Sequence, residues 1–261
     1  MKFLSKSLLS VTCASVLASG VMFSSAANAE LTAMAGVASE YYWRGLKVSN
    51  GAQVWGELTL ASESGFYGDL WASSEGFGVG PEYDLSAGWA GKFGDFGVNV
   101  GAVTYVYSMD STGTFCAADT QDSNGDCTGK TYVLEDSDPG DFTDVYVKMS
   151  FGPAFLNIYH NVALLQGQDF VNAGFTADKF TFAVGYQQFK DKAQLALGYD
   201  SDVSKVDYTY AEVTYAATKN LSFTVSSIID HSGDLNFFGI APVADTNRAK
   251  VIVSYSLPIE M

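Results

Sequence analysis

Two kinds of side chain in this sequence could carry chemistry: a few histidines and a large set of acids. The chain has 2 histidines and 29 aspartates and glutamates among 261 residues. Hydrolysis by a serine nucleophile needs a histidine beside it, and Ser150 lies near the opposite end of the segment that neighbours His160. No Gly-x-Ser-x-Gly segment occurs. We therefore expect no catalytic residues and no enzyme; the alternative is a Ser-His lipase.

The charged residues recur at alternate positions of β-like segments. Glu57, Asp69 and Asp84 each lie on the more polar face of such a segment, opposite an apolar face. In a membrane barrel, Arg or Lys on the lipid face near the midplane costs about 2–4 kcal/mol, and acids cost less, so the polar face points inward. This rule predicts a pore lining of Glu40, Arg44, Glu57, Asp69, Asp84, Asp144, Lys148, Glu212 and Lys250.

Two interpretations of this lining remain open. It is either a pore with acids in excess or a salt-bridged plug that fills a narrow barrel. Arg44 likewise has two interpretations. It sets an electric field against Glu40 and Glu57, or it pairs structurally with a neighbouring carboxylate.

The segment 109–140 combines many acids with two cysteines. Cys116 and Cys127 are an even pair in what we expect to be an exported chain, so we predict a disulfide between them. The run from Asp122 to Asp126 is typical of oxygen-ligand calcium loops, but its glycine falls one place early for an EF-hand. We expect a solvated acidic extracellular loop without a metal, the alternative being a divalent ion bridged to lipopolysaccharide phosphates.

The first 29 residues are typical of a cleaved signal peptide. Lys2 and Lys6 precede an apolar stretch, and Ala27-Asn28-Ala29 gives an A-x-A cleavage pattern before Glu30. Without those two lysines, 12 basic and 29 acidic residues leave a net charge of −17, which argues against nucleic-acid binding. We expect no cofactor.

Period-two alternation dominates the mature chain, 30–261, and helical periodicity is scarce. Short and long connections alternate between the segments, as in outer-membrane barrels with short periplasmic turns and longer extracellular loops. A soluble β-sandwich would also alternate along its strands, but its loops would not sort by length. We predict an all-β, transmembrane, antiparallel up-and-down barrel of about twelve strands, at 31–43, 52–62, 66–74, 82–91, 96–108, 141–151, 154–162, 169–178, 180–189, 205–217, 221–230 and 247–258.

The start of the mature chain resembles a known family. Tyr41-Tyr42-Trp43-Arg44-Gly45, then Val54-Trp55-Gly56-Glu57-Leu58 and Glu63-Ser64-Gly65-Phe66-Tyr67 are similar to the TorF-type porin family of bacterial outer-membrane proteins. The resemblance is clearest over 36–108 and implies a location in the outer membrane of a Gram-negative bacterium.

Together these features predict a porin-like channel for passive diffusion of small hydrophilic solutes, with a mild cation preference. Its expected partners are outer-membrane lipid and lipopolysaccharide, with no nucleic acid. The alternative is a closed structural or adhesion barrel that acts through its acidic surface loops.

Overall fold

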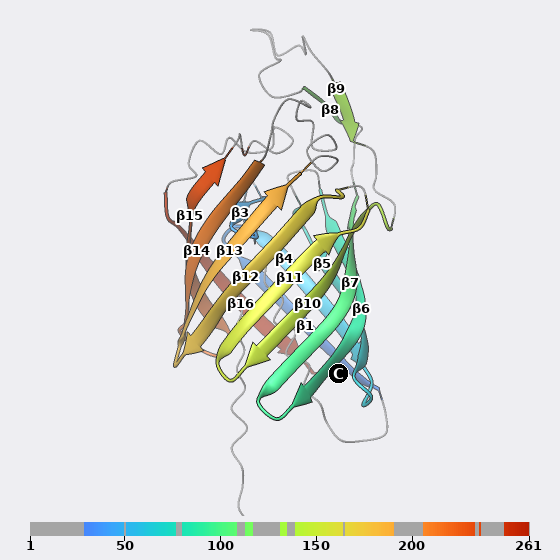
Figure 1. Ribbon diagram of the computed structural model, residues 1–261, viewed down its shortest axis with the longest axis vertical. Helices are drawn as coiled ribbons and strands as arrows, with labels where there is room; N and C mark the ends of the chain where they lie inside the picture. Colours follow the sequence, from blue (N-terminus) through green and yellow to red (C-terminus); the bar gives the residue numbers. More distant parts are fainter. Residues whose placement is uncertain are drawn as a thin grey trace, which may run out of the picture.

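Alternating side chains and tight turns produce a closed antiparallel barrel (Figure 1). The computed structural model describes residues 29–49, 51–76, 80–108, 113–116, 131–134, 139–163, 165–190, 206–232, 235 and 248–260. The barrel strands are β1 (Glu30–Ala38), β4 (Gln53–Ala61), β5 (Phe66–Ser73), β6 (Glu82–Phe93), β7 (Phe96–Tyr107), β10 (Phe142–Phe151), β11 (Ala154–Asn161), β12 (Gln168–Ala177), β13 (Phe180–Phe189), β14 (Val206–Ala216), β15 (Leu221–Ser232) and β16 (Lys250–Ile259). The predicted fold class is confirmed.

Sequence neighbours pair around the barrel, and β1 closes it by pairing with both β4 and β16. Short connections gather at one end, which we call the turn end, and long connections gather at the other, the loop end (Figure 1). Gly65 and Gly152 have φ of 92° and 54°, which short turns at the turn end require. A separate two-stranded sheet, β8 (Gly113–Cys116) with β9 (Thr131–Leu134), lies beyond the loop end.

The outer face of the barrel is apolar. On β4, Val54, Leu58 and Leu60 are 58%, 45% and 52% exposed, whereas Trp55, Glu57 and Thr59 are turned inward. Aromatic side chains collect on this face toward the turn end: Phe66, Phe93, Phe96, Phe151, Phe180 and Tyr255. Such a band suits lipid contact, with aromatic rings at a membrane interface. In the described part of the chain, no helix is long and apolar enough to span a membrane.

The prediction for the first strand is wrong at its end. It was expected to reach residue 43, but β1 ends at Ala38. Residues 39–52, which we call the inner loop, leave the wall there and include a small hairpin of β2 (Tyr42–Trp43) and β3 (Leu46–Lys47). The two-residue turn at 44–45 reverses the chain, so the first wall strand does not continue through these residues.

Aromatic residues near the strand ends divide between the two faces of the barrel. Tyr41, Trp43, Tyr105 and Tyr107 pack inside the barrel, whereas Phe151, 67% exposed, is on the outer face. The inward aromatics are held by buried polar partners described below, which lipid would not provide.

Three predictions lie outside the residues and side chains that the structure describes. These are the Cys116–Cys127 disulfide, the acidic part of 109–140 and the signal peptide 1–29.

Candidate functional site

The inner loop lies within the barrel lumen. Tyr41, Arg44, Leu46 and Val48 are only 3–6% exposed, although none belongs to a wall strand. Tyr41, Leu46 and Val48 pack in one cluster with wall residues from several strands: Trp71, Phe170, Phe189, Val206, Tyr208, Tyr210 and Ile228. The loop therefore narrows the lumen at the loop end of the barrel.

The tip of the inner loop is a tight turn. Tyr42 pairs with Lys47 and Trp43 pairs with Leu46, so Arg44 and Gly45 alone join the two short strands. Both residues have positive φ, 50° and 84°, as the type I′ hairpin turn requires. Arginine in this region costs about 1–3 kcal/mol and persists only where its surroundings hold it.

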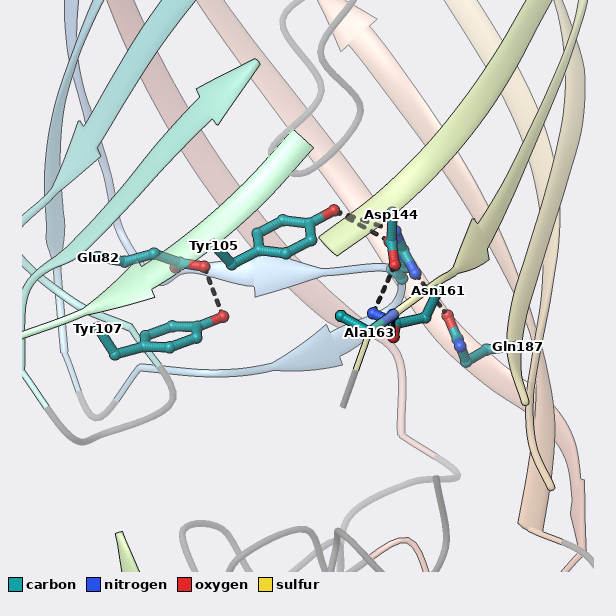
Figure 2. Close-up of polar contacts among 8 residues, drawn as sticks. Glu82, Tyr105, Tyr107, Asp144, Asn161, Ala163 and Gln187 are labelled. Carbon is teal, nitrogen blue, oxygen red and sulfur yellow. Dashed lines mark hydrogen bonds and ion pairs between the residues drawn. The ribbon is translucent and has the colours of Figure 1, made fainter. Parts of the chain in front are cut away.

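Three wall strands bind the Arg44 guanidinium. Its Nη2 atom lies 2.5 Å from Asp144 Oδ2 and donates to the Tyr105 hydroxyl at 3.2 Å. Its Nη1 atom donates to Gln187 Oε1 at 3.2 Å, and Asn161 donates to the other Asp144 oxygen at 2.9 Å. Figure 2 shows Tyr105 and Asn161 directed toward Asp144. The ion pair is almost completely buried, with side chains 4% and 2% exposed.

Aromatic rings enclose the same guanidinium. Its carbon lies 4.2 Å from the ring centre of Trp43, 4.8 Å from that of Tyr159 and 4.6 Å from that of Phe170. Burial lowers the pKa of Arg44, but Tyr105 and Asp144 raise it by more, so the net pKa is raised and the group stays charged. The arrangement supplies charge, hydrogen bonds and cation–π contacts to one side chain.

The backbone of the loop tip is fixed as well. The Tyr208 hydroxyl donates to the Arg44 carbonyl at 2.9 Å. Tyr210 lies between two glycines: a Cβ on Gly45 would come within 2.4 Å of its ring, and one on Gly185 within 2.2 Å. Gly45 is thus required by both its backbone angle and this close approach.

An acidic wall faces this region from β4, β5 and β6. It consists of Glu57, Asp69, Glu82 and Asp84, whose side chains all point inward. Thr59 donates to Asp69 at 2.5 Å, and Tyr107 donates to Glu82 at 2.8 Å, as Figure 2 shows for the second pair. Electrostatic interaction links Asp84 to Glu82, Asp69, Asp144 and Arg44.

Tyr41 of the inner loop lies against this wall. Burial first, and then the charges of Glu82 and Asp84, raise the pKa of Tyr41 well above its ordinary value near 10. Its hydroxyl therefore remains protonated at neutral pH and can donate to the acids.

The remaining predicted residues are distributed over the lumen. Lys148 lies 4.6 Å from the ring of Tyr146 and interacts with Glu57 and Asp69. Lys250 and Glu212 also point inward, from β16 and β14. Of the nine predicted pore-lining residues, the structure brings Arg44 together with Asp144, and Lys148 into range of Glu57 and Asp69.

Two predicted residues are not on the wall. Glu40 and Arg44 belong to the inner loop, where Glu40 Oε1 lies 2.5 Å from Lys47 Nζ, with both side chains about one-third exposed. The pore-lining role of all nine residues stays a prediction.

Glu82 also points into the lumen but is not among the nine predicted residues, because it is the first residue of its strand. Since it is two positions before Asp84, the alternation of 82–90 places it on the same face and could have indicated it.

His160 lies on the outer face, where its Nδ1 atom is 2.6 Å from Asp169 Oδ1. It pairs with Val145, and Ser150 lies five residues farther along β10, roughly 17 Å away at the rise of a strand. Ser150 therefore does not face His160. The expectation that the chain is not an enzyme stays a prediction.

The residues from 23 to 229 match the family profile described as "Bacterial protein of unknown function (Gcw_chp)". The chain belongs to this family. The match spans the inner loop and most of the barrel strands; the TorF-type name expected from the sequence is not confirmed by it. No curated protein matches the sequence.

Several solved structures are similar to this member of the Gcw_chp family. OprB from Pseudomonas putida is 11% identical, with 84% of this chain and 60% of that chain covered and a TM-score of 0.37. The outer membrane protein OprD from Pseudomonas aeruginosa is 13% identical, with coverage of 88% and 65% and a TM-score of 0.38. The chain thus spans less than two thirds of the length of these proteins.

An outer membrane channel from Pseudomonas putida is similar over nearly its whole length. It is 9% identical, with 92% of this chain and 98% of that chain covered and a TM-score of 0.36. Likenesses this weak do not bear on which solute a barrel passes.

Proposed function

We propose that this Gcw_chp protein is an outer-membrane channel that passes small hydrophilic solutes with a mild preference for cations. The apolar outer band and its aromatic rings fit a bilayer, and a closed barrel leaves no strand edge unpaired in lipid. The outer face would contact lipid and lipopolysaccharide. The turn end would face the periplasm and the loop end the exterior, as in other barrels of this kind.

One observation carries the proposal, namely the excess of acids that point into the lumen. Glu57, Asp69, Glu82 and Asp84 point inward from β4, β5 and β6, whereas the charge of Arg44 is paired with Asp144. An excess of acid concentrates cations in a narrow passage of low dielectric constant.

The test is the zero-current potential of the purified barrel in a planar bilayer under a salt gradient. The double variant Glu57→Gln/Asp69→Asn should shift this potential toward anions, because it removes two acids from the passage. Asp169→Asn is the matched control, since Asp169 lies on the outer face. The control should leave the potential unchanged. The shift of the double variant should shrink as salt rises, because the screening length falls from about 10 Å at 0.1 M to about 3 Å at 1 M.

A closed structural or adhesion barrel is the second candidate, and the packing of the inner loop favours it. Tyr41, Leu46 and Val48 pack tightly against the inward aromatics and leave these side chains almost without exposure. A barrel sealed by this cluster would act through its acidic surface loops. Conductance separates the two candidates: a folded barrel that passes no measurable current excludes the channel and leaves the closed form.

A further inference from the structure

Two neighbouring acids at the loop end of β6 are buried without full satisfaction of their oxygens. Glu82 is 0% exposed and Asp84 is 6% exposed. The Tyr107 hydroxyl donates to Glu82 Oε1 at 2.8 Å, but Glu82 Oε2 and Asp84 Oδ1 have no hydrogen-bond partner among the described residues. Buried carboxylate oxygens without partners are costly, so such a pair calls for a missing positive group.

The two acids share one face of the strand. Because side chains at positions i and i+2 of a strand point the same way, both carboxylates are directed into the same part of the lumen. The two carboxyl groups interact electrostatically with each other, and Asp69 on the next strand adds a third acidic group within range. Three acidic side chains are thus gathered here.

Oxygen-bearing side chains and backbone enclose this point. The hydroxyls of Tyr41 and Tyr107 interact with both carboxylates. Gly76, in the connection between β5 and β6, packs so closely that an added Cβ would lie 3.2 Å from Glu82 Oε2. The two acids are therefore closely enclosed, and the polar side-chain atoms known to approach them are oxygens.

The cationic side chains that the structure describes nearby are engaged elsewhere. Arg44 is paired with Asp144, and Lys47 of the inner loop is paired with Glu40. Lys148 interacts with Glu57 and Asp69, and the ion pairs found over the described ranges include neither Glu82 nor Asp84. Arg44 also interacts electrostatically with Asp84, but no described side chain forms an ion pair with either acid.

We propose that Glu82 and Asp84 bind one divalent cation, calcium in preference to magnesium. Two carboxylates match its charge, and hydroxyl oxygens and water would complete its coordination shell. The described residues include no group of three or more His, Cys, Asp or Glu suited to a metal, so the ion must accept an irregular set of oxygens. Calcium takes six to eight such ligands in flexible geometry, whereas magnesium demands a near-ideal octahedron and loses its water reluctantly.

Terbium luminescence on the full folded barrel in detergent tests this site. Terbium replaces calcium, and excitation of nearby tyrosines such as Tyr41 and Tyr107 sensitises its emission. The double variant Glu82→Gln/Asp84→Asn should bind one ion fewer per barrel than the native protein, and calcium should displace that ion at least tenfold more effectively than magnesium. The acids of 109–138 can hold ions of their own, so the difference between the two proteins is the quantity measured.

Glu212→Gln is the matched control, since Glu212 is also buried and inward-facing but lies on β14. It should bind as many ions as the native protein. Calcium should also raise the thermal unfolding midpoint of the native protein and of Glu212→Gln, but not that of the double variant. If the double variant fails to fold, the single variants Glu82→Gln and Asp84→Asn should each lower the affinity for this ion at least tenfold.

Equal ion counts in native protein and double variant would overturn the site, as would a native barrel that binds no ion. Conductance of the same samples is read separately. A barrel that binds calcium at this site but passes no current would reject the channel and support the cation site. A barrel that passes current but binds no ion there would support the channel and reject the cation site.

Discussion

Arg44 combines an unfavourable backbone angle with contacts to several strands of the barrel wall. Its φ of 50° would not persist on an exposed loop, but an ion pair, hydrogen bonds and three aromatic rings surround its guanidinium. The side chain therefore acts as the anchor of the inner loop, and its partners belong to strands far away in the sequence.

Removal of this anchor should destabilise the barrel strongly. Arg44→Ala leaves Asp144 buried without its cation, which we expect to lower the free energy of unfolding by about 3–5 kcal/mol. Urea unfolding of the folded barrel in detergent measures the loss. Lys47→Ala is the control, because its pair with Glu40 is about one-third exposed and should contribute about 0–1 kcal/mol. Equal losses in both variants would show that the buried pair has no special role.

Gly45 should tolerate alanine less well than another glycine of similar backbone angle. Gly45→Ala adds a Cβ 2.4 Å from the Tyr210 ring, whereas Gly94→Ala, at φ 64°, meets nothing within 4 Å. Both variants carry the left-handed strain of about 1–2 kcal/mol. Only Gly45→Ala must also displace the loop tip, so its unfolding free energy should fall further. A difference of zero between the two would contradict the packing of Tyr210 against the tip.

The inner loop and the barrel wall are separate elements. β2 and β3 pair only with each other, whereas the twelve wall strands form a continuous ladder without them. The loop adds an apolar cluster and the Arg44 contacts to the lumen, but its short strands β2 and β3 add no pairing to the twelve wall strands. Its removal should therefore change what passes through the barrel more than whether the barrel forms.

Replacement of residues 41–48 by a short glycine-serine linker should widen the channel. We expect single-channel conductance to rise severalfold, because the loop and the side chains packed on it occupy the lumen. The folded band on unheated denaturing gels should persist. Removal of the same number of residues, 117–124, from the acidic segment 109–140 serves as the control. It should leave conductance near its native value. Unchanged conductance after the inner-loop replacement would show that the constriction lies elsewhere.

At the scale of the whole molecule, one barrel wall separates two environments. Side chains alternate between an apolar exterior and a lumen that holds acids, bases, hydroxyls and amides. A substitution therefore has opposite consequences at adjacent positions of one strand, which gives a direct test of the membrane environment.

Leu58→Lys and Thr59→Lys differ by one position on β4. Leu58 is 45% exposed on the outer face, and a lysine there near the midplane should cost about 2–4 kcal/mol in a bilayer. Thr59 faces the lumen and bonds Asp69, so a lysine at that position gains an acidic neighbour and should cost less. Unfolding from lipid vesicles measures both. A smaller loss for Leu58→Lys than for Thr59→Lys would reject lipid as the environment of the outer face.

The sequence by itself determined the strands and their faces. Alternation along Gln53–Ala61 and Phe66–Ser73 sends Glu57 and Asp69 inward because successive side chains of a strand point to opposite faces. The alternation of short and long connections likewise indicated a barrel in which neighbours along the chain pair, because each such pairing is local.

Only the tertiary structure decided where the first loop goes. Tyr41, Trp43 and Arg44 continue the pattern of the first strand closely enough to suggest wall positions and interfacial rings. Their actual partners, among them Asp144, Phe170 and Tyr208, are about 100 or more residues away in sequence. Local alternation carries no information on such contacts, which exist only once the closed barrel brings distant strands around one lumen.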